Sequence, residues 1–126
     1  MILPDSSVWI AHFKRANASL AELLENDEAL CHPFIVGELA CGDLPSRAST
    51  LALLQTLPEA PLMQHEEVLI LVEWHRLMAP GIGWVDAHLL GSALLAGATL
   101  WTLDRSLANA ARKLGVAASP RTSGAH

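Results

Sequence analysis

The sequence predicts an α/β fold in which a mainly parallel sheet is covered by helices on both faces. Short apolar segments with strand-forming residues alternate with longer segments whose apolar residues recur at helical spacing. Gly and Pro residues separate many of these segments and mark their ends. At 126 residues with 52% hydrophobic side chains, the chain is long enough for one domain with a substantial core.

The first two predicted elements are a short strand and a helix. Residues 2–5 form the strand, in which Pro4 cannot donate a ladder hydrogen bond and is expected at an end or irregularity. Ser6 or Ser7 is suited to cap the following helix. The large apolar residues of this helix are Val8, Trp9, Ile10 and Phe13.

The next part of the chain predicts three more helices and a strand. A helix over about residues 19–26 precedes a candidate strand at residues 29–31. Pro33 suits the first turn of a helix that runs to about Gly42. A further helix, with leucines at helical spacing, ends at Pro58.

The central segment predicts a possible short strand and two helices. Residues 61–63 could form the strand, and an amphipathic helix after Glu66 is expected to include Met78. Asp86 opens the next helix, and Gly97 supplies its left-handed C-terminal residue. The inward positions of this helix include Leu89, Leu90, Ala93 and Leu94.

The last predicted elements are a strand at residues 99–103, a helix that Gly115 ends, and a final strand at residues 116–118. The helix is well specified because its apolar residues recur at i, i+3, i+4 and i+7. We expect a single domain over residues 1–118 followed by a flexible tail at residues 119–126.

Charge and composition restrict the function. The formal charge of −5 and the pI near 5.6 exclude a simple basic clamp for nucleic acid. The mean hydropathy of +0.33 is high for a small domain and suggests a surface for self-association or for a partner. We expect Cys31 and Cys41 to be buried, reduced thiols. No segment is typical of a secretory signal or a membrane span, so a cytoplasmic protein without membrane contact is expected.

Four acids occupy positions that favour a ligand site. Asp5 and Asp104 follow predicted strands, and ligands of parallel sheets gather at the carboxyl ends of strands. Asp86 lies at a helix start, where a capping role explains it equally well. Glu38 is placed on or beside the inward face of its helix, where an unpaired carboxylate is costly and a bound cation would stabilise it.

A cluster of carboxylates selects hard divalent cations, of which Mg²⁺ or Mn²⁺ suits a small pocket. Such ions stabilise negative charge on phosphoryl groups and lower the pKa of bound water. The acids therefore point to phosphodiester or phosphomonoester chemistry, although each acid taken alone is more often a cap or a turn residue.

Several segments carry a family resemblance: MILPDSSVWI, VGELACG, GWVDAHLLGSALLAGATLWTLD and RSLANAARKLG. In this order and context, from Met1 to about Val116, the chain resembles PIN-domain proteins, specifically the VapC-type toxin ribonucleases of toxin–antitoxin pairs. The resemblance implies a three-layer α/β/α sandwich with a central, mainly parallel sheet. It also implies an acidic cluster at the carboxyl edge that binds Mg²⁺ or Mn²⁺ for RNA cleavage.

By position, the resemblance implies that Asp5, Glu38 and Asp86 form the metal-binding core. Asp104 would be the fourth acid, which orients the attacking water or completes a second metal position. The catalytic and metal-binding sets are thus the same four residues.

Two hydroxyl residues and one departure accompany these acids. Ser6 and Thr102 would steady the carboxylates or a water, with helix capping and strand packing as equally good alternatives. Pro4 stands where the family generally has an aliphatic residue, so the sheet pairing beside Asp5 must adapt to it. Arg112 and Lys113, with Arg105, could contact phosphates or could simply form a solvated helix face.

The expected partners are an RNA substrate, a small antitoxin protein and a second copy of the chain in a homodimer. As the resemblance implies, Trp9 and Phe13 would line a groove for the antitoxin. Operator DNA would be contacted indirectly, through the antitoxin. Two other functions stay open: a non-catalytic partner-binding module, and a receiver-like or phosphatase-like Mg²⁺ domain. The latter normally needs a lysine near the phosphoryl site, and neither Lys14 nor Lys113 directly follows a predicted strand.

Overall fold

The computed structural model describes residues 1–78 and 81–119. Two strands and seven helices make up this described part. In chain order they are β1 (Ile2–Pro4), α1 (Ser6–Lys14), α2 (Ala18–Glu25), α3 (Pro33–Ala40), α4 (Arg47–Thr56), α5 (His65–His75), α6 (Trp84–Ala96), β2 (Thr99–Trp101) and α7 (Arg105–Lys113).

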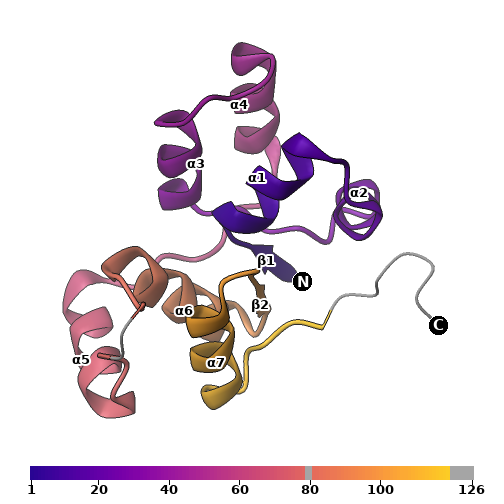
Figure 1. Ribbon diagram of the computed structural model, residues 1–126. Helices are drawn as coiled ribbons and strands as arrows, with labels where there is room; N and C mark the ends of the chain where they lie inside the picture. The colour runs from indigo at the N-terminus through magenta and orange to yellow at the C-terminus, as the bar shows by residue number, and fades with distance from the viewer. Residues whose placement is uncertain (79–80, 120–126) are drawn as a thin grey trace.

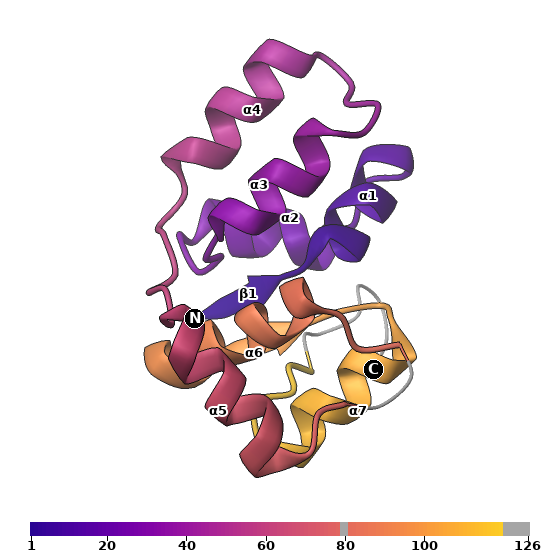
Figure 2. The same cartoon turned by 90° about the vertical axis from the view of Figure 1, so that its left-hand side faces the viewer.

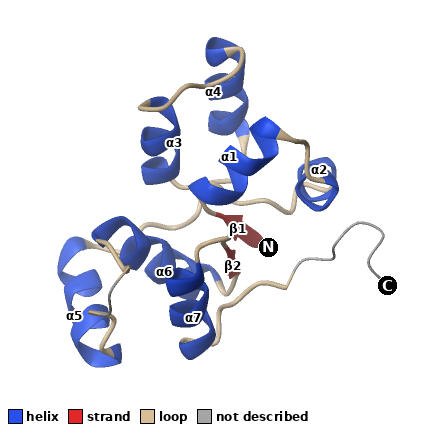
Figure 3. Ribbon diagram, in the orientation of Figure 1, coloured by secondary structure: helices blue, strands red, loops and turns tan. Residues whose placement is uncertain are grey.

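The helices form two layers with the strands between them. Helices α1 to α4 lie on one side of β1 and β2, and α5 to α7 lie on the other side (Figures 1 and 2). The strands are short compared with the helices that cover them (Figure 3). The predicted α/β sandwich is therefore confirmed, with two helical layers around a parallel sheet.

The sheet is parallel in every described pairing. β1 pairs with β2, so that Leu3 lies opposite Leu100. Single parallel bridges extend the sheet at both edges: Ile2 with Ala29, Cys31 with Glu59, and Leu100 with Ala117. Across the sheet the order is the segment at 59, the segment at 29–31, β1, β2 and the segment at 117. Parallel order brings the carboxyl ends of β1 and β2 to one edge.

Pro4 explains why β1 pairs so briefly with the segment at 29–31. Ile2 donates to Glu28 O at 2.9 Å, and Leu30 donates to Ile2 O at 2.8 Å. The next bond of this parallel ladder would need an N–H on Pro4, which proline lacks. Pro4 is also the last residue of β1, in agreement with its expected place at a strand end.

Several predicted strands are shorter than expected or displaced. The segments at 29–31 and 116–118 contribute bridges rather than full strands. The expected strand at residues 61–63 is wrong, because the bridge forms two residues earlier, at Glu59. The neighbouring chain turns into α3 at Pro33, so residues 61–63 have no strand to pair with.

Some predicted helix positions also differ. Asp5, not Ser6 or Ser7, is the N-cap residue of α1. Met78 lies beyond the end of α5 and is 57% exposed, and Leu94 of α6 is 37% exposed. The expectation that both residues face inward is therefore wrong.

The core joins the two layers through the sheet. Its largest fully buried side chains include Leu3, Trp9, Ile35, Leu90, Leu100 and Leu107. Cys31 is buried as expected, but Cys41 is exposed, which corrects the expectation for that thiol. The expected tail, residues 119–126, lies outside the described residues except for Ser119. No described helix is long and apolar enough to cross a membrane.

Candidate active site

Asp5 lies at the carboxyl end of β1 and caps α1. Its side chain is 7% exposed. Asp5 Oδ1 accepts hydrogen bonds from Val8 N at 3.3 Å and from the hydroxyl of Ser7, and Oδ2 accepts one from Thr102 Oγ1 at 2.6 Å. Each carboxylate oxygen therefore has a donor, and these donors fix the orientation of a buried charge.

Asp104 occupies the equivalent position after β2 and caps α7. Its Oδ1 accepts a hydrogen bond from Ser106 N at 3.2 Å, and its own N–H donates to Thr102 Oγ1 at 3.0 Å. Thr102 therefore contacts both the carboxylate of Asp5 and the backbone of Asp104. Because β1 and β2 are parallel neighbours, both acids lie at the same sheet edge.

Glu38 projects from α3 toward the start of α1. Ser6 Oγ donates a hydrogen bond to Glu38 Oε1 at 2.6 Å. Glu38 is exposed, so the expectation that it faces the core is wrong. Ile35 and Leu39 take the buried positions of α3 and turn Glu38 outward. Because Glu38 is exposed, no cation is needed to offset a cost of burying its charge. Its assignment to the site therefore depends on its neighbours, Ser6 and Asp86.

Asp86 is the third residue of α6 and is half-buried, so it does not open the helix as expected. Its Oδ2 accepts a hydrogen bond from Gly83 N at 2.9 Å, which completes a capping interaction. Burial raises the pKa of Asp86, the Gly83 N–H lowers it, and the carboxylates of Asp104, Asp5 and Glu38 raise it further. The carboxylates of Asp104, Asp5 and Glu38 thus lie near enough to Asp86 to affect its pKa.

The site has the donor chemistry for a hard cation but not a closed cage. Four carboxylates supply the oxygen ligands that Mg²⁺ and Mn²⁺ prefer. Within residues 1–78 and 81–119, however, no three His, Cys, Asp or Glu side chains are arranged to hold a metal ion as they stand. Glu38 is held by Ser6, while Asp86 and Asp104 are held by backbone N–H groups of their own helix starts. The donor set fits the ion, and coordination would draw these side chains inward against those hydrogen bonds.

Ser7 also belongs to this site, although its place in the sequence predicts only a helix cap. Its hydroxyl donates to Asp5, accepts from Leu103 N at 3.0 Å and lies 3.4 Å from Thr102 Oγ1. It thus ties the start of α1 to the end of β2. A serine two positions after an N-cap Asp is the signal that could have identified it, because that position faces back toward the cap.

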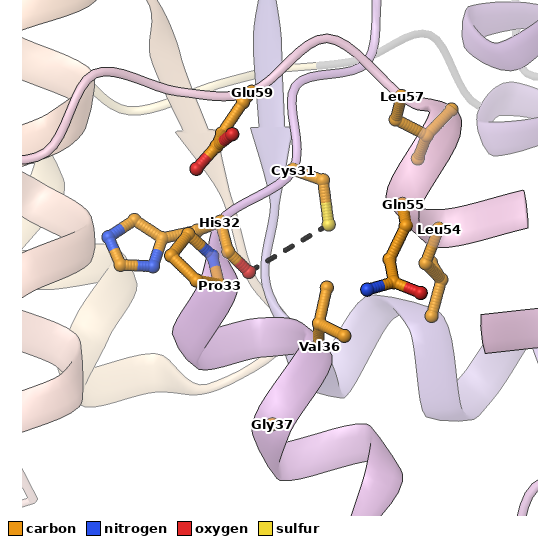
Figure 4. Close-up of a pocket in the computed structure, with 9 residues that line it drawn as sticks. All are labelled: Cys31, His32, Pro33, Val36, Gly37, Leu54, Gln55, Leu57 and Glu59. Carbon is orange, nitrogen blue, oxygen red and sulfur yellow. Dashed lines mark hydrogen bonds between the residues drawn. The ribbon is translucent and has the colours of Figure 1, made fainter. Parts of the chain in front are cut away.

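A different cavity lies between α3, α4 and the segments at 31 and 59, and none of the four predicted acids lines it. Its volume is about 430 Å³, and it is lined by Cys31, His32, Pro33, Val36, Gly37, Leu54, Gln55, Leu57 and Glu59 (Figure 4). Cys31 Sγ donates to the carbonyl of His32 at 3.9 Å, and burial raises the pKa of this thiol to about 11. A protonated thiol is a poor nucleophile, so this cavity does not supply a cysteine-based active site.

Comparisons with known proteins agree with this geometry. The PIN domain matches residues 2–113. The chain is also 50% identical over 124 residues to Ribonuclease VapC32 of Mycobacterium tuberculosis, in strains CDC 1551 / Oshkosh and ATCC 25618 / H37Rv; the match covers 98% of this chain and 100% of each relative. The chain therefore belongs to the PIN-domain family. Its similarity to VapC32 over the whole length confirms the resemblance to the VapC type.

A solved structure supports the fold independently. The crystal structure of PAE2754 from Pyrobaculum aerophilum matches with a TM-score of 0.60 over 89% of this chain and 80% of that chain. The two sequences are 19% identical, so this likeness concerns the fold alone.

Proposed function

We propose that this protein is a metal-dependent endoribonuclease and the toxin of a toxin–antitoxin pair. It would hydrolyse RNA phosphodiester bonds with Mg²⁺ or Mn²⁺ held by Asp5, Glu38, Asp86 and Asp104. The observation that carries the proposal is the proximity of these four carboxylates: burial raises the pKa of Asp86, and the nearby carboxylates of Asp104, Asp5 and Glu38 raise it further. A divalent cation relieves that repulsion and attracts a phosphate.

The name of the VapC32 relatives, Ribonuclease, supports RNA as the substrate. When bound, the metal would offset charge on the phosphate and lower the pKa of a bound water. Asp5 is oriented for this role by Ser7 and Thr102, and Glu38 by Ser6. Asp104 would orient the attacking water, and no residue needs to form a covalent intermediate.

The proposed partners follow from two surfaces. An antitoxin segment fits a cavity of about 500 Å³ that includes Ile10 and Phe13 of α1 and has Glu38 on its wall. Trp9 does not contribute to this groove, because it is 1% exposed and belongs to the core. Operator DNA would be reached through the antitoxin, and the proposed location of the pair is the cytoplasm.

A homodimer is supported by the outer face of α5. Ile70 and Trp74 are one helical turn apart and are 64% and 80% exposed. Large apolar side chains at this exposure favour burial against a second surface.

The test is cleavage of total RNA, with mapping of the new ends, by wild type, Asp5→Asn and Asp86→Asn in Mg²⁺ or Mn²⁺. We expect cleavage by the wild type and a loss of at least about 100-fold in each variant. Asp27→Asn is a matched control, since Asp27 has a φ of 53° that Asn tolerates well. Equal cleavage by all four proteins would remove the assigned site. Absence of cleavage by the wild type would favour a partner-binding module without catalysis.

The PIN match over residues 2–113 favours the nuclease over the receiver-like alternative. That alternative predicts a stable phospho-Asp adduct after incubation with a small phosphodonor. Mass spectrometry of the intact protein would detect the adduct, and we expect none.

A further inference from the structure

The lysine and arginine side chains of this acidic protein are unevenly distributed. Of the eight Lys and Arg residues, four lie on α7 or directly after α5: Arg76, Arg105, Arg112 and Lys113. All four are exposed. In the described part of the chain, none of them forms an ion pair with a carboxylate. By contrast, Arg47 donates to the carbonyl groups of Ala40 and Gly42 at the end of α3, which gives it a structural role.

Two of these cations converge on one cavity. It measures about 230 Å³ and is lined by Arg76 and Lys113 together with the polar side chains of Ser106 and Asn109. Lys113 Nζ donates to His75 O at 2.6 Å, which fixes the ammonium group beside the backbone of Arg76. Two like charges held together repel each other, and an anion between them would remove that cost. Hydroxyl and amide groups add donors of the kind that bind phosphate oxygens.

The cavity is lined in part by α7, the helix that Asp104 caps. α7 begins directly after Asp104 and extends about 12 Å from Arg105 to Lys113 at 1.5 Å per residue. Gly81, shortly before α6, packs closely onto the first turn of α7, because a Cβ at this position would collide with Ser106 Oγ. The same segment leads to Gly83, whose N–H holds Asp86. Arg105 thus directly follows Asp104, and Arg112 and Lys113 lie farther along the same helix.

We propose that Arg76 and Lys113, with Arg105 and Arg112 along α7, form a binding track for the sugar-phosphate backbone of the RNA next to its cleavage point. This inference rests on the proposed ribonuclease function and extends it to how the substrate is held. The protein has a net charge of −5, so binding of RNA requires a local group of positive charges, and the track supplies one. Phosphate contacts of this kind position the substrate but read no sequence.

The test measures binding of a fluorescent single-stranded RNA by anisotropy between 50 and 300 mM salt. All proteins carry Asp5→Asn, so that the RNA is not cleaved. We expect Arg76→Gln and Lys113→Gln each to weaken binding about 3- to 10-fold at low salt and to lower the slope of log K against log salt by roughly 0.7. The effect should be similar for different RNA sequences, as for any backbone contact.

Arg15→Gln is the matched control. Arg15 and Arg76 are both exposed arginines at the C-cap of a helix, and both substitutions remove one charge. We expect Arg15→Gln to retain the parental affinity and salt slope. If both track variants bind RNA with the parental affinity, the proposal is wrong. The cations would then be better explained as contacts for an acidic protein partner.

Cleavage assays in the background with Asp5 intact separate the two hypotheses. If the wild type cleaves RNA but the track variants retain their KM, the track is wrong and the nuclease stands. If the track is right, KM rises in both variants while kcat changes little. If the wild type neither binds nor cleaves RNA, both proposals fail.

Discussion

Thr102 Oγ1 donates a hydrogen bond to Asp5 Oδ2 at 2.6 Å, although 97 positions separate the two residues in the chain. The same hydroxyl oxygen accepts the N–H of Asp104 at 3.0 Å. One threonine side chain therefore sets the relative position of the acids that follow β1 and β2. Packing alone would not explain Thr102, because its hydroxyl group makes hydrogen bonds to Asp5 and to Asp104.

Thr102→Val tests this contact because it keeps the shape of the side chain and removes the hydroxyl. The buried Asp5 oxygen would lose its donor, and we expect a loss of about 1–3 kcal/mol in the free energy of unfolding. RNA cleavage should fall about 10-fold or more, since Asp5 loses its orientation. Thr102→Ser, which retains the hydroxyl, is the control and should stay near wild type. Similar losses in both variants would attribute the effect to packing instead. Chemical denaturation and cleavage rates supply the two measurements.

Asp86→Asn should make the protein more stable and inactive at the same time. Because burial and neighbouring carboxylates raise the pKa of Asp86, its ionised form is disfavoured in the folded state. The stabilising contribution of protonation is present at low pH and is lost as pH rises through the raised folded pKa. At pH 7 the amide removes that repulsion and can still accept the Gly83 N–H. Thermal melting without metal should show a higher Tm than wild type, and a lower Tm would contradict the proposed repulsion.

Mg²⁺ or Mn²⁺ should raise the melting temperature of the wild type. Binding to the folded state alone stabilises it by about 3 kcal/mol when the ion is at 100 times its Kd. Glu38→Gln should reduce this metal-dependent shift. Glu25→Gln, at the end of α2, removes the same charge away from the acids and should leave the shift intact. Equal shifts in both variants would place the ion elsewhere, and differential scanning fluorimetry is sufficient to compare them.

We expect the free energy of unfolding to fall in mild acid because of His32. It is 1% exposed, and burial together with nearby His88 lowers its pKa from 6.5 to about 4. The unfolded chain binds this proton more tightly, so stability is present above pH 6.5 and falls as pH drops toward 4. The contribution of this residue is on the order of 3 kcal/mol.

His32→Asn should lessen this pH dependence. Asn can replace the N-cap acceptor that His32 Nδ1 offers to Phe34 N at 3.0 Å, but it does not titrate. Urea unfolding at pH 7, 5.5 and 4.5 should therefore give a shallower decline in the variant, whatever its absolute stability. Parallel declines in the two proteins would assign the pH dependence to other groups.

Trp74→Glu should shift the protein from dimer to monomer. The substitution puts a charge on the most exposed aromatic side chain of α5, where a second copy is proposed to pack. Light scattering after size-exclusion chromatography measures the mass directly. Glu73→Gln, on the adjacent residue of the same helix, is the control that should leave the mass unchanged. A wild-type mass near 13.5 kDa at all concentrations would contradict the dimer.

The parallel α/β architecture could be predicted because it depends on patterns local to the sequence. Helical spacing in α7 and the left-handed glycine after α6 both appear in the structure as expected. The segment at 61–63 could not be placed, since its pairing is decided by where a distant neighbour enters α3. Strand propensity says nothing about such a partner.

The site shows the same division. Asp5 and Asp104 could be placed because an acid after a parallel strand necessarily lies at the carboxyl edge. The outward orientation of Glu38 could not be predicted from its spacing, because Ile35 and Leu39 take the buried positions of α3. The hydroxyl contacts of Ser7 depend on the loop after β2, so spacing along α1 alone could not reveal them.

The two layers of helices meet at the acids. Glu38 belongs to the layer of α1 to α4, whereas Asp86 lies in the first turn of α6 and Asp104 caps α7, both in the opposite layer. An ion shared by them would act as a cross-link between two halves of the molecule that are joined here by short strands. Sliding of one layer over the other would separate Glu38 from the acids of the opposite layer. A partner or a substitution far from the acids could therefore abolish activity by displacing α3 alone.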